Sequence, residues 1–147
     1  MRKQAKLKAL SLLTRMDRTE AQLRQKLKEK EYPEEVIEHA VSYVKSFGYI
    51  NDLAYAERYI QSRMHTKSRR ELYAGLLQKG VSKEHVLQAL EICYESESEI
   101  DAIRRLCEKK HFHSENCTED EKKKIYGYLM RKGFRHEDVW KVINLNA

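Results

Sequence analysis

One segment of this 147-residue chain occurs three times, and this repeat constrains the fold more than any other feature. The copies begin at Leu23, Leu72 and Ile125, which lie 49 and 53 residues apart, and they align without a gap. Because a fixed internal period is typical of repeat architectures, we expect three similar structural units in a row. The copies read Leu23-x3-Leu27-x2-Lys30-Glu31-Tyr32, Leu72-x3-Leu76-x2-Lys79-Gly80-Val81 and Ile125-x3-Leu129-x2-Lys132-Gly133-Phe134.

Helical signals stand at matching places in every copy. The apolar residues recur at the three- and four-residue spacing of an amphipathic helix. A capping box precedes each copy: a Ser or Thr begins it, and a Glu or Gln follows three residues later. Gly80 and Gly133 stand where a left-handed residue commonly ends a helix. The capping boxes are Thr19-x-x-Gln22, Ser68-x-x-Glu71 and Thr118-x-x-Glu121.

The repeat predicts an all-α fold of three tandem three-helix repeats, with domains at 1–50, 51–95 and 96–147. Only five Gly and one Pro are present, which also favours helices over a turn-rich sheet fold. Since each repeat of about 45 residues buries only a small core, neighbours would share burial in an elongated or curved array. The acidic segment 95–99 is the predicted hinge. The expected helices are 3–15, 19–30, 33–47, 52–64, 68–79, 82–94, 97–110, 118–132 and 135–145.

Positive charge is concentrated in the first two repeats. Of the formal net charge of +6, residues 1–50 carry +4, residues 51–94 carry +2 and the remainder carry none. This distribution suggests an anionic partner, either nucleic acid or an acidic protein groove. A basic cluster surrounds the start of the second repeat's middle helix, where free backbone N–H groups favour anions. Ordinary solvated charge, partly paired with nearby Glu, explains that cluster equally well. The cluster consists of Arg63, Lys67, Arg69 and Arg70. The same basic set includes Arg15, Arg18 and the three lysines 122–124, and solvated charge is favoured for those lysines because they follow three acidic residues.

Two further groups of residues could carry chemistry. Cys107, His111, His113 and Cys117 are potential zinc ligands, but their spacing matches no common zinc finger. Thiols on flanking helices and surface histidines are the favoured interpretation, so neither a metal nor another cofactor is expected.

Aromatic residues among basic ones can stack nucleobases or anchor a protein interface, and Tyr49 is open to either role. Packing is favoured for Tyr55 and Tyr59, which lie one helical turn apart.

Catalytic motifs are absent from the sequence. It has no P-loop, no Gly-rich dinucleotide turn, no G-x-S-x-G and no H-E-x-x-H, so neither an enzyme nor a catalytic residue is expected.

No run approaches the roughly 20 apolar residues of a membrane helix, and the N-terminus lacks the apolar region of a signal peptide. With three cysteines in an unexported chain, we expect reduced thiols and a cytoplasmic protein.

The segment Gly48-Tyr49-Ile50-Asn51-Asp52-x2-Tyr55-Ala56-x2-Tyr59-Ile60-x2-Arg63 resembles the bacterial RecX family of regulators of the RecA recombinase. The resemblance covers about residues 5–145, and two later motifs support it. One departure is Glu31, where the family commonly has Gly. Because Glu adopts a left-handed conformation less readily than Gly, the geometry of that turn is open. The supporting motifs are Leu76-x2-Lys79-Gly80-Val81 and Leu129-x-Arg131-Lys132-Gly133-Phe134.

The resemblance implies tandem three-helix repeats and a specific partner, the RecA filament on single-stranded DNA. Proteins of this family lie in the helical groove of the filament and bridge neighbouring protomers. They inhibit strand exchange and ATP hydrolysis, and they dampen the coprotease activity that drives the SOS response. Weak DNA binding is also implied, whereas catalytic residues and cofactors are not.

We therefore expect a monomeric, cytoplasmic, non-enzymatic inhibitor of RecA that regulates recombination and DNA repair. The alternative is a direct DNA-binding helical protein that acts without RecA through helix–turn–helix-like helices. Few basic residues lie on the last helix of each repeat, which disfavours a DNA-reading helix. The expected partner-binding or DNA-binding residues are Tyr49, Arg63, Lys67, Arg69, Arg70 and Arg135.

Overall fold

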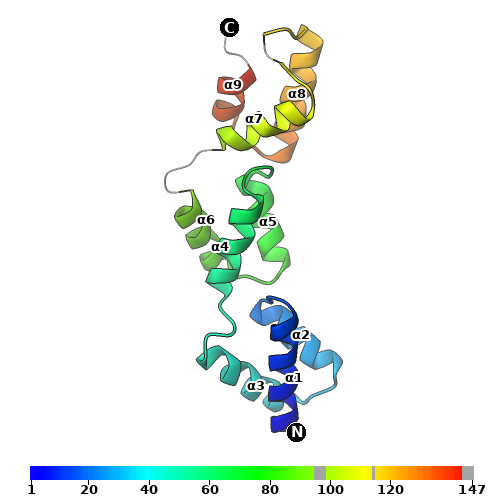
Figure 1. The fold of residues 1–147 in the computed structure, drawn as a ribbon, viewed down its shortest axis with the longest axis vertical. Helices are drawn as coiled ribbons and strands as arrows, with labels where there is room; N and C mark the ends of the chain where they lie inside the picture. Colours follow the sequence, from blue (N-terminus) through cyan, green and yellow to red (C-terminus); the bar gives the residue numbers. More distant parts are fainter. Residues whose placement is uncertain (95–98, 114, 144–147) are drawn as a thin grey trace. The chain divides into compact units, whose positions relative to one another are not determined.

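The computed structural model describes residues 1–94, 99–113 and 115–143, and within these ranges it contains nine α-helices and no strand (Figure 1). This confirms the all-α prediction. Seven of the nine expected helices end within one residue of the observed bounds at both ends. The helices are α1 Arg2–Arg15, α2 Glu20–Glu29, α3 Glu34–Ser46, α4 Asp52–Arg63, α5 Arg69–Gln78, α6 Lys83–Cys93, α7 Ile100–Lys109, α8 Glu119–Lys132 and α9 His136–Ile143.

The chain divides into two compact units, and the helices of the middle repeat contribute to both. The N-terminal unit comprises Met1–Arg58 and Leu76–Ala89, and the C-terminal unit comprises Tyr59–Gly75 and Leu90–Ala147. The domain boundaries at 50 and 95 stay a prediction. The expected hinge at 95–99 lies, apart from Glu99, outside the described residues.

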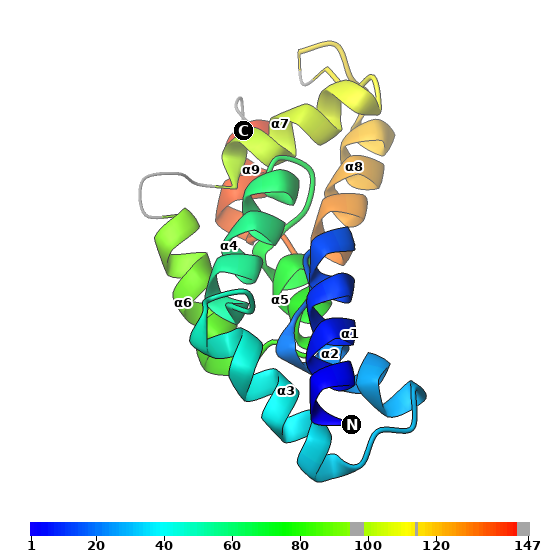
Figure 2. The ribbon, with the colours of Figure 1, turned by 60° about the horizontal axis from the view of Figure 1, so that its bottom comes forward.

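In the N-terminal unit, α1 packs against α2 and α3 (Figure 1, Figure 2). Ala5 and Ala9 on α1 are fully buried, and these small side chains allow the neighbouring helices to approach closely. Burying such apolar faces is the main source of stability for short helices, because helices of this length are marginal alone. The remaining buried core residues are Leu12, Leu23, Leu27, Val36, Ile37, Ala40, Val41, Val44 and Ile50.

The C-terminal unit has an equivalent core between α7, α8 and α9. One face of α7 is strongly apolar and packs against α9, which also contacts α8, and inward residues of all three helices form one core. Cys107 lies in this core as a buried residue, 5% exposed. The core residues are Ala102, Ile103, Leu106, Cys107, Ile125, Leu129, Phe134, Val139 and Ile143.

A direct junction between two helix ends organises the N-terminal unit. The fully buried Thr19 caps α2, because its hydroxyl oxygen accepts a hydrogen bond from the backbone N–H of Gln22 at 3.1 Å. The same hydroxyl donates a hydrogen bond to the carbonyl oxygen of Lys79, just after the end of α5, at 2.7 Å. The Asp52 carboxylate accepts from the backbone N–H of Glu20 at 2.9 Å. Thr19 and Asp52 thus satisfy unpaired backbone N–H groups at the start of α2, and the Thr19 hydroxyl also satisfies a carbonyl at the end of α5.

The C-terminal unit contains an equivalent junction, in which the hydroxyl and carbonyl groups come from matching repeat positions. The hydroxyl oxygen of Ser68 accepts from the backbone N–H of Glu71 at 3.1 Å, and it donates to the carbonyl oxygen of Lys132 at 2.5 Å. The carboxylate of Glu99 accepts from the backbone N–H of Arg69 at 2.7 Å. Two of the three capping residues predicted from sequence, Thr19 and Ser68, therefore also join the middle helices of successive repeats.

Glycine is required at each junction for two reasons. Gly80 and Gly133 have φ angles of +92° and +96°, which L side chains rarely adopt. A Cβ atom at Gly80 would overlap the Cβ of Ala21, and one at Gly133 would lie 2.7 Å from the Cδ of Arg70. Glu31, at the matching position of the first repeat, has a φ of +64° and an exposed side chain. The turn therefore keeps the left-handed geometry at Glu31, where the side chain has room.

Removing the junction hydroxyl should destabilise the protein. We expect Ser68→Ala to lower the free energy of unfolding by about 1–2 kcal/mol, because it leaves two buried backbone groups without a partner. Urea unfolding measures the loss. Ser68→Thr, which retains a hydroxyl as at Thr19, should recover most of it. The control is Ser82→Ala, which removes an exposed cap that accepts one hydrogen bond, from the backbone N–H of His85, and it should lower the free energy of unfolding by less. An equal loss in both variants would show that the second bond of Ser68 does not stabilise the protein.

Replacing Glu31 by glycine should have the opposite effect. A left-handed residue other than Gly costs roughly 1–2 kcal/mol, and the greater backbone entropy of an unfolded Gly offsets about 0.5–1 kcal/mol of this. Glu31→Gly should therefore raise the free energy of unfolding by about 0.5–1 kcal/mol. Thermal and urea unfolding both test this, with Glu29→Gly as the control that places Gly inside α2. Destabilisation by both variants would show that φ at residue 31 is not strained.

Candidate interaction surface

The structure places the expected interaction residues in both units. The five basic ones belong to the C-terminal unit, four of them around the α4–α5 connection and Arg135 just before α9. Tyr49 belongs to the N-terminal unit, between α3 and α4. Their exposure differs, and this separates residues that are open to a partner from residues that maintain the fold.

Arg63 lies on the surface over an aromatic ring. Its guanidinium is 4.0 Å from the ring centre of Tyr59, and its Nη1 donates to the hydroxyl of Ser62 at 2.9 Å. Tyr59 itself packs against Gly75, where an added Cβ would overlap the phenol oxygen. Tyr59 therefore packs within the second repeat, and this contact accounts for a glycine within α5.

Arg69 is largely committed to the junction. Its guanidinium lies 4.3 Å from the ring centre of Tyr94, and its Nε is buried, with no hydrogen-bond partner in the described part of the chain. Its backbone N–H donates to Glu99, whose side chain is only 2% exposed. Burial raises the pKa of the Glu99 carboxyl, against the opposing effects of the Arg69 hydrogen bond and the charges of Arg69 and Arg135.

Arg70 and Arg135 are the most accessible of the basic residues beside the C-terminal junction. Both are exposed, and the aliphatic stem of Arg70 lies against Gly133. Lys67 is half-buried, and its backbone N–H donates to the carbonyl of Arg63 at 3.0 Å. A partner could therefore reach Arg70 and Arg135 without disrupting the fold.

Tyr49 is part of an exposed aromatic cluster, defined here as Tyr43, Phe47 and Tyr49. The rings of Phe47 and Tyr49 stack at 5.8 Å with 23° between their planes, and Tyr43 meets Phe47 edge-on at 5.1 Å. Phe47 and Tyr49 are 60% and 55% exposed, and the Lys6 ammonium lies 4.6 Å from the Tyr43 ring centre. From the sequence we expected Tyr49 at the surface that binds a partner, but not Phe47 or Lys6. The spacing of Tyr43, Phe47 and Tyr49 within seven positions could have indicated Phe47.

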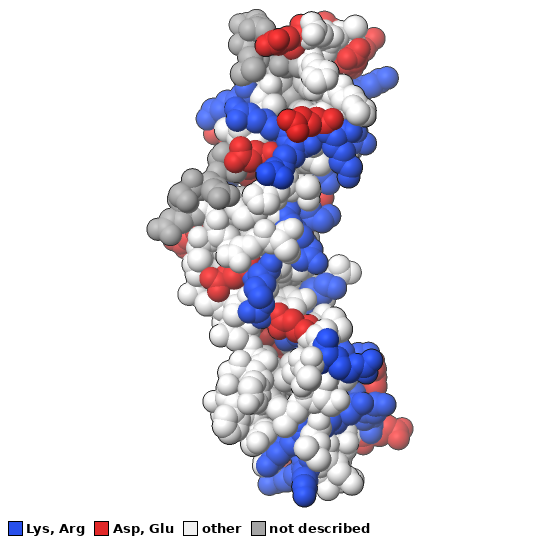
Figure 3. All heavy atoms as spheres, viewed as in Figure 1, with Lys and Arg blue, Asp and Glu red and all other residues white. Residues whose placement is uncertain are grey.

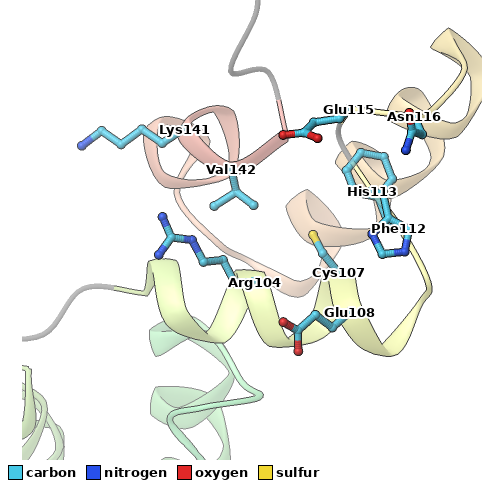
Figure 4. Close-up of a pocket in the computed structure, with 9 residues that line it drawn as sticks. All are labelled: Arg104, Cys107, Glu108, Phe112, His113, Glu115, Asn116, Lys141 and Val142. Carbon is cyan, nitrogen blue, oxygen red and sulfur yellow. The ribbon is translucent and has the colours of Figure 1, made fainter.

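The cysteine and histidine segment is not gathered into a metal site. Burial raises the pKa of the Cys107 thiol to about 11, which disfavours the thiolate that zinc binding needs. Cys107 and His113 line one hollow of about 380 Å³ together with Arg104 and Lys141, whereas His111 and Cys117 do not line it (Figure 4). Among the described residues, no group of three or more His, Cys, Asp or Glu side chains is placed to hold a metal ion.

No described helix is long and apolar enough to cross a membrane.

Three family models match the chain in order along its sequence. They are the first three-helix domain of RecX at residues 5–43, the second at 51–90 and the third at 97–143. The chain belongs to the RecX family.

Curated relatives and solved structures agree with this assignment. A protein of Caldanaerobacter subterraneus subsp. tengcongensis named regulatory protein RecX is 40% identical over 144 residues, covering 97% of this chain and 71% of the relative. The regulatory protein RecX of Clostridium tetani is 33% identical over 140 residues, covering 92% and 64%. The chain thus spans about two thirds of the length of these relatives.

The fold is also that of RecX crystal structures. The structure of RecX from Lactobacillus salivarius superposes with a TM-score of 0.84 at 24% identity, covering 98% of this chain and 95% of that one. A second crystal structure, of a regulatory protein RecX, gives a TM-score of 0.80 at 25% identity, covering 99% and 72%.

Most of the segment that resembles RecX is needed for the fold. Gly48 follows α3 with a φ of +75°, and Asn51 accepts from the backbone N–H of Ala54 at 3.0 Å at the start of α4. Asp52 forms part of the N-terminal junction, and Ala56 and Ile60 are fully buried. Tyr49 and Arg63 are exposed and bear large side chains that the fold does not bury, so they are available to bind a partner.

Neutralising the buried carboxyl of Glu99 tests the C-terminal junction. Because its folded-state pKa is raised, wild-type stability from this group is greatest at low pH and is lost as the pH rises through the folded pKa. Glu99→Gln keeps an oxygen acceptor for Arg69 without the buried charge. We expect it to be more stable than wild type at pH 8, with the difference falling toward zero as the pH approaches 5.

Urea unfolding across this pH range measures the effect, with the exposed Glu91→Gln as the control for a lost carboxylate. The control should show no comparable pH-dependent gain. A Glu99→Gln variant that is less stable than wild type at every pH would show that the charge itself supports the junction.

Proposed function

We propose that this RecX-family chain is a negative modulator of RecA that binds the RecA filament on single-stranded DNA and inhibits its recombinase, ATPase and coprotease activities. The observation that carries the proposal is the ordered match of all three RecX domains along the chain. The curated relatives named regulatory protein RecX support a regulatory role. Inhibition of this kind requires only binding and no chemistry by the chain itself.

The accessible side chains favour a surface of several modest contacts. The aromatic cluster offers large, partly exposed rings of the type that anchor protein interfaces, and Arg70 and Arg135 offer exposed cations. Contacts on two units of one chain act together, because binding by one raises the effective concentration of the other. A filament repeats the same surface on every protomer, so it suits a partner with several binding patches.

The decisive experiment measures the DNA-dependent ATPase of RecA with the full chain at substoichiometric amounts. We expect inhibition by the wild-type protein. A double variant, Phe47→Ala with Tyr49→Ala, should need at least about tenfold more protein for half-inhibition, because interface aromatics commonly contribute more than 1 kcal/mol each. Leu87→Ala, which removes an exposed apolar side chain from α6, should inhibit like wild type.

No inhibition by wild-type protein at any ratio would overturn the proposal. Binding to bare duplex DNA, measured across a range of salt concentrations, tests the direct DNA-binding alternative. Tight binding without RecA that weakens steeply with salt would support that alternative, because phosphate contacts release counterions. The last helices α3, α6 and α9 carry one Lys each and no Arg, which disfavours it.

A further inference from the structure

A basic hollow lies between α1 and α2 in the N-terminal unit, with a volume of about 480 Å³. Figure 3 shows Lys and Arg side chains gathered over these helices. Five cationic side chains line the hollow with a single carboxylate, that of Glu29. Arg15 and Arg18 belong to the basic set noted in the sequence, but none of the five is among the partner-binding or DNA-binding residues expected there. The five are Lys8, Arg15, Arg18, Lys26 and Lys30.

Most of this charge is uncompensated. Glu29 pairs with Lys26 at 3.7 Å, and Arg18 donates through Nε to the carbonyl of Leu12 at 3.4 Å. Lys8, Arg15 and Lys30 form no ion pair within the described ranges.

Other cations of the same unit share the available carboxylates, although exposed lysines such as Lys3, Lys28 and Lys83 also form no ion pair within the described ranges. Arg24 binds Glu20 at 3.1 Å and Glu38 at 2.8 Å. Lys45 binds Glu20 at 3.0 Å, and the Arg24 and Lys45 partners are among the causes that lower the pKa of the Glu20 carboxyl. Glu20 and Glu38 therefore neutralise other cations and do not reduce the positive charge of the hollow.

Helix electrostatics explain only part of this arrangement. The carbonyl groups at a helix C-terminus favour cations, which accounts for Arg15 at the end of α1 and Lys30 after α2. Lys8 lies in the middle of α1, where this effect has faded. Like charges that converge from two helices repel each other, so an anionic ligand would relieve a cost that the free protein carries.

The floor of the hollow indicates which kind of anion fits. Leu12, which is 5% exposed, and Met16, which is 57% exposed, line it with apolar surface. Methionine is flexible and polarizable, so it adapts to an apolar side chain of a ligand. No aromatic residue lines the hollow, whereas sites for unpaired nucleic acid strands use aromatic rings to stack the bases.

We infer that this hollow binds an acidic segment of a protein partner, with carboxylates on Lys8, Arg15 and Lys30 and one apolar side chain on Leu12 and Met16. Charge-assisted hydrogen bonds from Lys and Arg would hold the carboxylates, and the apolar floor would select against a simple polyanion. The identity of the partner as RecA rests on the proposed function, but the binding chemistry of the hollow does not.

The test uses a fluorescein-labelled peptide, acetyl-Glu-Asp-Leu-Glu-Asp-amide, and the full chain, with binding followed by fluorescence anisotropy. A triple variant, Lys8→Gln with Arg15→Gln and Lys30→Gln, should bind at least about tenfold more weakly. The matched control, Lys3→Gln with Lys28→Gln and Lys83→Gln, removes the same charge from exposed positions of the same unit that do not line the hollow, and should bind like wild type. Replacing the peptide's Leu by Ser should weaken binding to wild type. Circular dichroism and urea unfolding check that all variants fold.

Equal losses in the triple variant and its control would overturn the inference, because they would show general charge attraction. It would also be overturned if the triple variant lost binding to an oligothymidylate probe but kept binding to the peptide. In the RecA ATPase assay, weaker inhibition by the triple variant than by the control would support RecA as the partner, whereas equal inhibition would overturn that identity. If wild-type protein does not inhibit RecA, the proposed function fails, and the peptide comparison still decides the hollow.

Discussion

The hydroxyl bond between the start of one middle helix and the end of the next is the interaction on which each unit depends. A helix start has unpaired N–H groups and a helix end has unpaired carbonyls, and burying either without a partner is costly. Thr19 and Ser68 are both fully buried, and the hydroxyl of each accepts from an N–H at a helix start and donates to a carbonyl at a helix end. The carboxylates of Asp52 and Glu99 then accept from the N–H of the following residue, so successive repeats are joined by polar bonds as well as by apolar packing.

The junction explains why family membership was easier to predict than the binding surface. The glycines and the capping Ser and Thr that recur in the repeat are those that the junction requires, so the sequence pattern reports the fold. Exposed residues such as Tyr49, Arg70 and Arg135 are not required by any packing rule. Their role therefore depends on a partner, and only comparison or experiment can assign it.

Helices and caps were predictable because their signals are local, whereas the second bonds of the capping residues were not. The hydroxyl of Thr19 reaches a carbonyl 60 residues away, and that of Ser68 reaches one 64 residues away. The burial of Glu99 likewise depends on how α5 and α7 meet, although its sequence neighbours are acidic and polar. At Glu31, sequence reasoning could weigh the cost of a left-handed Glu but could not show that its side chain had room.

The basic hollow depends on tertiary structure in the same way, since Lys8 and Lys30 converge only when α1 and α2 pack together. Net charge alone gave a weak argument, because many proteins carry as much without binding an anion. The ion pairs show which charges are free to bind a ligand. Glu20 and Glu38 pair with Arg24 and Lys45, and the Asp52 carboxylate accepts from the backbone N–H of Glu20 at the start of α2. These acidic residues of the N-terminal unit are thus engaged within its own fold, and three cations that they leave unpaired, Lys8, Arg15 and Lys30, converge on a surface with an apolar floor. A surface of this kind is better suited to a mixed acidic and apolar segment of a protein than to a uniform phosphate backbone.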